Sequence, residues 1–224
     1  MDAILPAAGL SSRMRGIPKF LLPIDIEYTT LLEHHLENLS LICETIFLPT
    51  RKDLIPLIES LEFNIDNLKI IEMQSETMSE TVINTIDSSD ANHFILTMPD
   101  TFFIGESAFE LLDREPLICE LACWKIRDEQ RGKLGEVLID ENNSVLQIVD
   151  KKPDNGFEFA WGALTFSKEL IKYIDIKDPH IGYAVANAIR KKEEIKALKL
   201  EGKYYDCGTP EEYLKLLEET FIKK

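Results

Sequence analysis

Short apolar runs alternate with amphipathic segments along the first half of the chain. Short, continuous apolar runs predict buried strands, whereas apolar residues spaced three and four apart predict helices. Leu32, Leu36 and Leu39 have the helical spacing. These patterns predict strands at residues 3–7, 44–49, 68–73 and 93–100, and helices at residues 30–41, 53–61 and 79–86. Alternating strands and helices are typical of a largely parallel sheet with helices on both faces.

The second half of the chain has a different pattern. It predicts strands at residues 117–126, 135–139, 145–149 and 160–166, with turn-forming residues at 141–144 and 153–156. Helices are expected at residues 168–174, 181–192 and 210–222, the last capped by Thr209 and opened by Pro210. We therefore expect an α/β fold with a Rossmann-like mixed sheet and a smaller antiparallel lobe at residues 134–162. Because no linker, repeat or low-complexity tract interrupts the pattern, residues 1–224 are predicted to form one domain.

Composition narrows the kinds of partner. The formal net charge is −15, so the surface repels nucleic acid and anionic membranes. An anionic ligand would need a local basic pocket. No apolar stretch approaches the ~20 residues of a membrane span, and no signal-peptide pattern opens the chain. Cys119 and Cys123 are four residues apart without a second metal-type pair, so zinc is disfavoured, and buried free thiols in a reducing compartment are expected. These features favour a cytoplasmic protein.

Candidate chemistry begins in the segment 5–24. A buried strand runs into Ala8 and Gly9, and then into a stretch containing Arg13 and Lys19. Cations on a glycine turn at the carboxyl end of a strand suit a triphosphate. The P-loop and dinucleotide-binding patterns are both absent. The alternative is a solvated basic loop with no ligand.

The run AAGLSSRMRGIPK resembles the signature of the nucleotidyltransferase superfamily that makes nucleotide sugars, which includes glucose-1-phosphate thymidylyl- and uridylyltransferases. Arg13, Pro18, Lys19 and Pro23 fit its pattern. Ser11 replaces the second glycine. The short spacer at residues 14–17 is closer to the molybdenum-cofactor type of nucleotidyltransferase. The resemblance implies the nucleotide-diphospho-sugar transferase fold, with a nucleotide-binding half at about 1–115 and an acceptor-binding half at about 116–224.

Two carboxylates match the superfamily's metal ligands. Asp100 in TMPDTFF and Asp206 in YYDCGTPEEY resemble the residues that hold Mg²⁺. Asp100 also follows a buried strand, and residues at the carboxyl ends of strands in such sheets face the crevice where ligands bind. Taken alone, Asp100 reads as a turn residue and Asp206 as part of a capped helix start.

The resemblance also assigns the acceptor side. VDKKP resembles the Glu-Lys-Pro motif, which gives Lys152 the contact with the acceptor's phosphate. Lys151 stands at the glutamate position, which suggests a different or more anionic acceptor. Gly135 and Gly162 resemble glycines that let the acceptor approach the backbone. The alternatives are two lysines in a solvated turn and ordinary strand glycines.

The nucleotide side is assigned in the same way, with Gln74 and Ser79 lying where these enzymes recognise the base. The implied catalytic residues are Arg13, Lys19, Asp100 and Lys152. The implied nucleotide-binding residues are Leu5, Ala7, Ala8, Gly9, Arg13, Lys19, Gln74 and Ser79.

The implied reaction joins an NTP (dTTP, UTP or CTP) to a sugar 1-phosphate or similar acceptor, giving an NDP-sugar and pyrophosphate with Mg²⁺ as cofactor. The acceptor phosphate, with a second pKa of about 6, is mostly dianionic at neutral pH and needs no general base. An inactive nucleotide-binding regulatory subunit and a cytidylyltransferase for a non-sugar phosphorylated acceptor remain alternatives. A glycosyltransferase would want an Asp-x-Asp motif, which MPDTF lacks. Assembly into a homo-oligomer is left open.

Overall fold

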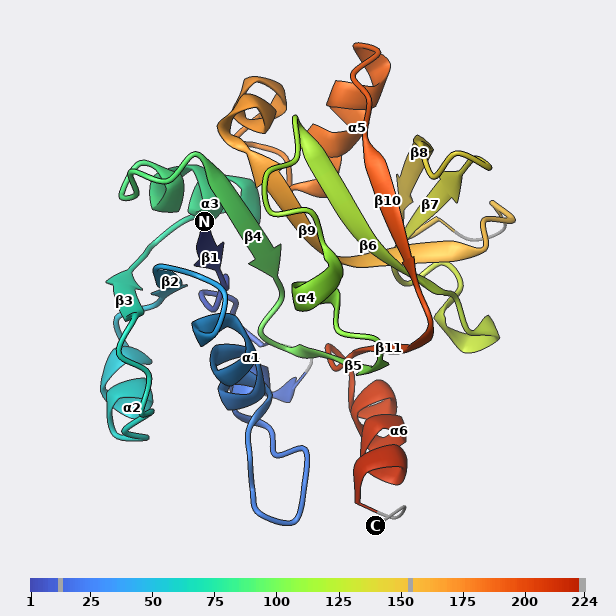
Figure 1. Ribbon diagram of the computed structural model, residues 1–224. Coiled ribbons are helices and arrows are strands. Elements are labelled where there is room, and N and C mark those ends of the chain that lie inside the picture. Colours follow the sequence, from blue (N-terminus) through green and yellow to red (C-terminus); the bar gives the residue numbers. More distant parts are fainter. Residues whose placement is uncertain (12–13, 153–154, 222–224) are drawn as a thin grey trace.

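Strands and helices alternate along most of the chain in the computed structural model, which describes residues 1–11, 14–152 and 155–221 (Figure 1). The strands are β1 (Asp2–Ile4), β2 (Ile46–Thr50), β3 (Leu68–Glu72), β4 (His93–Thr97), β5 (Thr101–Gly105), β6 (Cys119–Lys125), β7 (Gly135–Ile139), β8 (Val145–Asp150), β9 (Phe159–Ser167), β10 (Lys196–Leu200) and β11 (Gly202–Asp206). The α-helices are α1 (Leu31–Ser40), α2 (Ile55–Glu59), α3 (Met78–Ile86), α4 (Ala108–Leu111), α5 (Gly182–Arg190) and α6 (Pro210–Thr220). The 3-10 helices that lie wholly within the described residues are η2 (Lys19–Leu21), η3 (Asp128–Gln130) and η4 (Lys168–Tyr173).

Within the described residues, nine strands form one mixed sheet, in the order β10-β6-β9-β4-β1-β2-β3, with the β7–β8 hairpin attached through β9. Neighbours are parallel except that β9 runs antiparallel to β4, β6 and β7, and β7 runs antiparallel to β8. The predicted mixed, largely parallel sheet is confirmed. The antiparallel strands expected at residues 134–162 extend this sheet through β9.

Two strands of the structure, β5 and β10, were not predicted. The run expected as one strand at residues 93–100 ends at Thr97, and β5 begins four residues later. Pro99 and Asp100 form the turn between them, closed by the N–H of Thr101 donating to Met98 O (3.2 Å). The second strand, β10, carries Lys196 and Lys199 among apolar residues, and it pairs in parallel with β6 at the edge of the sheet.

Strand β5 pairs with β11 in a separate antiparallel ribbon, distinct from the main sheet. Gly105 and Gly202 face each other at one end, with φ of +116° and +127°. A Cβ at Gly202 would lie 1.9 Å from Ile104 O, and one at Gly105 would lie 2.5 Å from Glu201 O. Only glycine fits this crossing, because the backbones approach too closely for any side chain.

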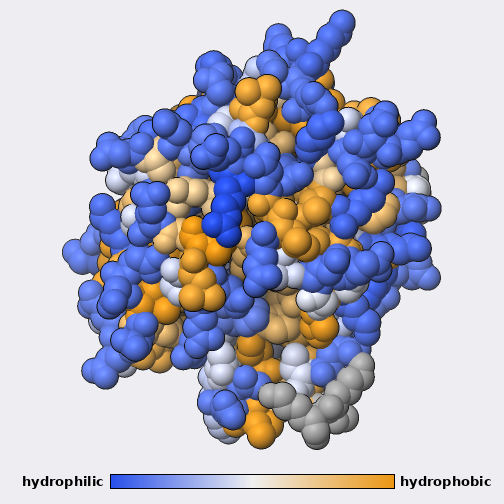
Figure 2. All heavy atoms as spheres, in the orientation of Figure 1, coloured by the Kyte–Doolittle hydropathy of each residue, from blue (hydrophilic) through white to orange (hydrophobic). Residues whose placement is uncertain are grey.

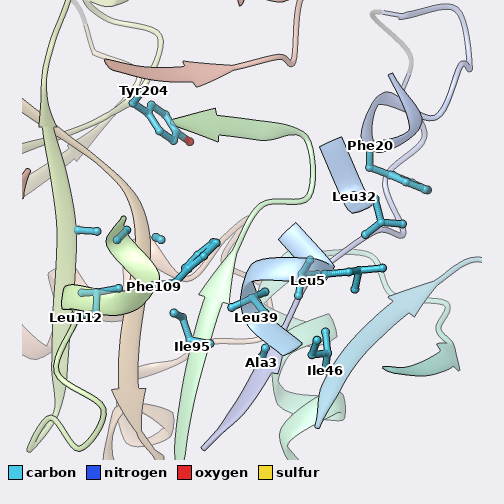
Figure 3. Close-up of a cluster of buried hydrophobic side chains, with 14 of the residues drawn as sticks. Ala3, Leu5, Phe20, Leu32, Leu39, Ile46, Ile95, Phe109, Leu112 and Tyr204 are labelled. Atoms are coloured by element: carbon cyan, nitrogen blue, oxygen red, sulfur yellow. The ribbon is translucent and has the colours of Figure 1, made fainter. Parts of the chain in front are cut away.

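The core lies on both faces of the sheet because successive strand residues point in opposite directions. Ala3 and Ile95 pack with α1, α2 and α4 on one face, whereas Ile4 and Phe94 pack with α3 and α5 on the other. Figure 3 shows the first cluster between the strands and α1, with Phe109 of α4 and Leu112 just after this helix beside it. Burial on both faces explains the continuous apolar runs seen in the sequence.

The helix starts follow the expected capping chemistry. Thr30 and Glu33 form a capping box at the start of α1. Thr209 Oγ1 accepts the N–H of Glu212 (3.4 Å) ahead of Pro210, as predicted. The helix expected at residues 168–174 is instead the 3-10 helix η4.

Polar side chains cover most of the face seen in Figure 2, with apolar residues in small groups between them. This surface agrees with the net charge of −15. In residues 1–11, 14–152 and 155–221, none of the helices has the length and apolarity needed to cross a membrane.

A buried histidine ties α1 to the start of the ribbon. His35 is fully buried, and its Nε2 donates to the backbone oxygen of Thr101 (2.8 Å). Since a carbonyl oxygen only accepts, Nε2 carries the proton, and Nδ1 is left without a hydrogen-bond partner. Burial, together with the neighbouring His34, lowers the pKa of His35 to about 3.

This histidine makes a defined contribution to acid unfolding. Unfolding restores the ordinary pKa of 6.5, so the unfolded chain binds a proton that the folded chain rejects. The His35 contribution to stability is therefore complete above pH 6.5 and is lost as the pH falls toward 3. We expect His35→Gln, whose amide can still donate to Thr101 O, to flatten the fall by up to ~1.4 kcal/mol per pH unit. Urea unfolding from pH 7 to pH 4 measures this slope, and equal slopes for the variant and wild type would contradict it.

Candidate active site

A cavity of about 540 Å³ opens where β1 and β4 end. Leu5 and Ala7 continue to donate backbone hydrogen bonds to the β2 side (2.9 Å each). Pro6 has no N–H to donate toward β4, so the pairing of β1 with β4 stops at Ile4. Pro6 and Met98 then line the opening between the two strands. This is the crevice at the carboxyl ends of strands where ligands bind in open α/β sheets.

The predicted nucleotide loop lies along this cavity. Ala8, Gly9 and Lys19 line it, whereas Leu5 and Ala7 are buried in the core behind it. Arg51 Nη1 donates to Gly9 O (2.7 Å) and holds the loop against the end of β2. Arg13, predicted to bind phosphate, lies outside the described residues.

The ribbon brings the two predicted metal-binding carboxylates together. Asp206 pairs in register with Thr101, the neighbour of Asp100, and the N–H of Cys207 donates to Asp100 O (3.0 Å). Asp100, Asp206 and Lys19 all line a cavity of about 330 Å³ that shares Lys19 and Asp206 with the larger one. Residues separated by more than a hundred positions in the chain thus form one polar cluster.

Burial and the neighbouring Asp100 affect the ionisation of Asp206. Lys19 Nζ forms an ion pair with Asp100, and both side chains are largely buried. Burial and then the nearby Asp100 raise the pKa of Asp206, against the opposing effects of Gly208, Lys19 and Lys151. The N–H of Gly208 donates to Asp206 Oδ1 (2.9 Å), and a Cβ at Gly208 would approach that oxygen to 2.8 Å. Desolvation and the charge of Asp100 together outweigh these opposing effects, so the folded state disfavours the ionised form of Asp206.

A second network of side-chain contacts holds β11, the strand that ends in Asp206, and the sequence did not predict it. Arg127 forms an ion pair with Glu212 of α6 (2.6 Å), and Gln130 Nε2 donates to Tyr204 O (2.8 Å). Arg127 also lies over the ring of Tyr205, 4.5 Å from its centroid. These contacts fix β11 to the 127–130 loop, but the partners are about 80 residues apart and leave no local pattern in the sequence.

The two glycines predicted on the acceptor side both line the main cavity. A Cβ at Gly135 would lie 2.3 Å from Trp161 Nε1, and one at Gly162 would lie 2.2 Å from the ring of Tyr204. Aromatic packing thus requires glycine at both positions, whatever the ligand.

The two predicted lysines separate. Lys151 lines the main cavity with Asp206, whereas Lys152 lines a neighbouring cavity of about 200 Å³. Both cavities share Asp150, Trp161 and His180, which the sequence analysis did not select.

Asp150 and His180 form a pair between the two cavities. His180 Nε2 lies 3.0 Å from Asp150 Oδ2, and the N–H of Gly182 donates to Nδ1 (3.2 Å). Burial alone would raise the pKa of Asp150, but His180 and Lys151 outweigh it and the pKa is lowered. The sequence shows His180 without a partner, because its partner lies thirty positions away on another element.

The two residues predicted to recognise the base do not line the main cavity. Gln74 is exposed and Ser79 is buried at the start of α3, and neither lines the main cavity. Their neighbours Ser75, Thr77 and Met78 do line it. The segment therefore borders the cavity, through residues that the resemblance did not select.

This fold and site define an α/β protein of the nucleotide-diphospho-sugar transferase type. Similar solved structures include a UDP-glucose pyrophosphorylase complexed with UDP-glucose, 18% identical, covering 97% of both chains with a TM-score of 0.80. The inositol-1-phosphate CTP transferase from T. maritima is 16% identical, covering 97% of this chain and 96% of that one, with a TM-score of 0.79. A structure assigned as a glucose-1-phosphate thymidylyltransferase from Bacillus anthracis is 16% identical, covering 98% and 94%, with a TM-score of 0.78.

Residues 3–138 match the model of the MobA-like NTP transferase domain, and the chain belongs to this family. The predicted superfamily and fold are thereby confirmed. The chain matches no curated protein sequence.

The crowded carboxylates predict a gain of stability on neutralisation. Asp206→Asn keeps an oxygen for the N–H of Gly208 but removes the charge beside Asp100. Because the folded state raises the pKa of Asp206, ionisation destabilises the fold as the pH rises above the ordinary value of 3.8.

We expect Asp206→Asn to melt about 2–4 °C above wild type at pH 7 in EDTA, which corresponds to about 1 kcal/mol in a chain of this size. The difference should shrink as the pH approaches 3.8. The exposed Asp66→Asn is the matched control and should not change the melting temperature. A lower melting temperature for Asp206→Asn at pH 7 would contradict the stated charge balance.

Proposed function

We propose that the chain transfers a nucleotide from an NTP to a sugar 1-phosphate, or a similar phosphorylated acceptor, and releases pyrophosphate. The observation that carries this proposal is the convergence of Lys19, Asp100 and Asp206 on the 330 Å³ cavity, which shares Lys19 and Asp206 with the 540 Å³ cavity. Membership of an NTP transferase family supports the reaction type. The names of the similar structures, which include UDP-glucose and CTP, support UTP, CTP or dTTP as donor.

The donor set near Asp206 fits Mg²⁺. Carboxylate oxygens are hard ligands, and Mg²⁺ at nucleotide sites is held by one or two carboxylates together with substrate phosphates. In the described part of the chain, no group of three or more His, Cys, Asp or Glu side chains is placed to hold a metal ion. Asp100 and Asp206 would hold the ion, and the chemistry it supplies when bound is neutralisation of phosphate charge.

The rest of the reaction depends on positioning and charge. An oxygen of the acceptor phosphate attacks the α-phosphorus of the NTP, the bond to the β-phosphate breaks, and pyrophosphate leaves with the electron pair. The acceptor is already mostly dianionic at neutral pH, so no side chain has to remove a proton. Lys19, paired with Asp100 in the free protein, would turn to the triphosphate. Arg13 and Lys19 would then stabilise the charge on the leaving pyrophosphate.

A regulatory protein that binds a nucleotide without turnover is the alternative. The convergence of Lys19, Asp100 and Asp206 in one cluster supports turnover. Release of pyrophosphate from a panel of NTPs and sugar 1-phosphates tests the proposal directly.

Loss of either charged partner should remove turnover while keeping the fold. We expect Asp100→Asn and Lys19→Ala each to lower kcat about a hundredfold or more, the usual cost of losing one preorganised charge contact. Pyrophosphate release measures kcat, and circular dichroism checks the fold. The exposed Asp66→Asn and Lys52→Ala are matched controls with unchanged rates. Near-full Mg²⁺-dependent activity in Asp100→Asn would overturn the metal assignment.

Nucleotide binding should also be visible without turnover. We expect at least one of CTP, UTP, dTTP, GTP and ATP to raise the melting temperature in the presence of Mg²⁺, because a ligand at 100 times its Kd adds about 2.7 kcal/mol. Lys19→Ala should reduce the shift. If none of the five nucleotides shifts the melting curve, the proposed donor class is wrong.

A further inference from the structure

The consecutive lysines at the end of β8 serve different cavities. Lys151 has a left-handed φ of +47°, and its N–H donates to Leu134 O (3.1 Å). This backbone conformation breaks the alternation of side chains that β8 imposes up to Asp150. The two neighbouring lysines therefore do not share one site.

Lys151 lines three cavities, of about 540, 330 and 240 Å³, and Asp206 lines all three with it. Lys19 lines the first two, so Lys151 and the nucleotide loop border the same two cavities as Asp206. Lys152 lines only the 200 Å³ cavity, which includes neither Asp206 nor Lys19.

Lys151 is also an available cation. Lys19 is paired with Asp100, but no salt bridge among the described residues includes Lys151. Lys151 lines the main cavity together with Asp150 and Asp206. Lys133, which lines two of the same cavities, adds a second positive charge there. An anion bound next to Asp206 would therefore face the positive charges of Lys151 and Lys133.

The 200 Å³ cavity has a different chemistry. Asp150, His180 and Lys152 line it together with Trp161. Trp161 Nε1 is buried, and within the described residues it has no hydrogen-bond partner. A buried donor left without an acceptor is costly unless a ligand supplies one. Among the described residues, this cavity is lined by one lysine and the main cavity by three, Lys19, Lys133 and Lys151, so the main cavity offers more positive charge to a phosphate.

We propose that Lys151, and not Lys152, binds the acceptor's phosphate beside Asp206, and that Lys152 lies over the polar body of the acceptor in the smaller cavity. The inference rests on the proposed function for the identity of the acceptor as a phosphate monoester. It reassigns the phosphate contact that the sequence resemblance gives to Lys152. It also gives a reason for lysine at the position where glutamate is expected.

The test is a titration with inorganic phosphate, followed by isothermal calorimetry or thermal shift, which needs no turnover. Lys151→Gly removes the ammonium without backbone strain, because glycine accepts a φ of +47°. We expect it to weaken phosphate binding about tenfold or more, the usual effect of losing a charged hydrogen bond. Lys152→Ala should change phosphate affinity less than twofold.

The matched control is Lys192→Gly, which removes a lysine of the same left-handed conformation (φ +68°) at the end of α5. It should change neither phosphate affinity nor the melting temperature. The proposal is overturned if phosphate binding is weakened only in Lys152→Ala, equally in Lys151→Gly and Lys152→Ala, or in neither variant. A wild-type protein that binds no phosphate would also overturn it.

Steady-state kinetics separates this proposal from the proposed function. With an NTP and sugar phosphate that react, Lys151→Gly should raise KM for the sugar phosphate about tenfold and leave KM for the NTP unchanged. An unchanged KM for the sugar phosphate would overturn the Lys151 assignment while the reaction class stands. If no pair reacts but phosphate binding still depends on Lys151, the proposed reaction fails and the anion site stands.

Discussion

The candidate site depends on the pairing of β5 with β11. Neither strand belongs to the main sheet, yet their register places Asp206 opposite Thr101 and so beside Asp100. His35 anchors the start of β5 from α1, while Arg127 and Gln130 anchor β11 through Tyr204 and Glu212. Without this ribbon the two carboxylates, one from each half of the chain, would have no fixed relation to each other.

The local electrostatics oppose the global charge. The chain carries a net charge of −15, but its main cavity is bordered by Lys19, Lys133 and Lys151. The proposed reaction would bring two anionic substrates together there, and lysines set against an acidic surface would favour their approach at this cavity. The Lys19–Asp100 pair keeps one of these charges neutralised in the free protein. In the proposed reaction, the phosphates of the substrates would compete with Asp100 for this lysine.

Sequence periodicity predicted most strands and helices because these elements bury one or both faces in a single core. It missed β10, whose two lysines resemble a solvated segment, and it missed β5, because Pro99 and Asp100 indicate the end of a strand. Motif order indicated Lys19, Asp100 and Asp206 as a group, and the structure brings these three together. The roles of the predicted site residues and the single-domain division stay predictions. The Asp150–His180 pair and the separation of Lys151 from Lys152 depend on long-range contacts and one backbone angle, which no local pattern encodes.

The close backbone crossing at Gly105 and Gly202 has a consequence beyond the fold. These two residues touch no cavity lined by the candidate site residues, yet the ribbon cannot form its observed end with any other residue there. A damaging substitution at either glycine would act by displacing Asp100 from Asp206, which is a defect of assembly. In a mutational map of the protein, this pair would stand out as a remote group of intolerant positions that marks the ribbon rather than the chemistry.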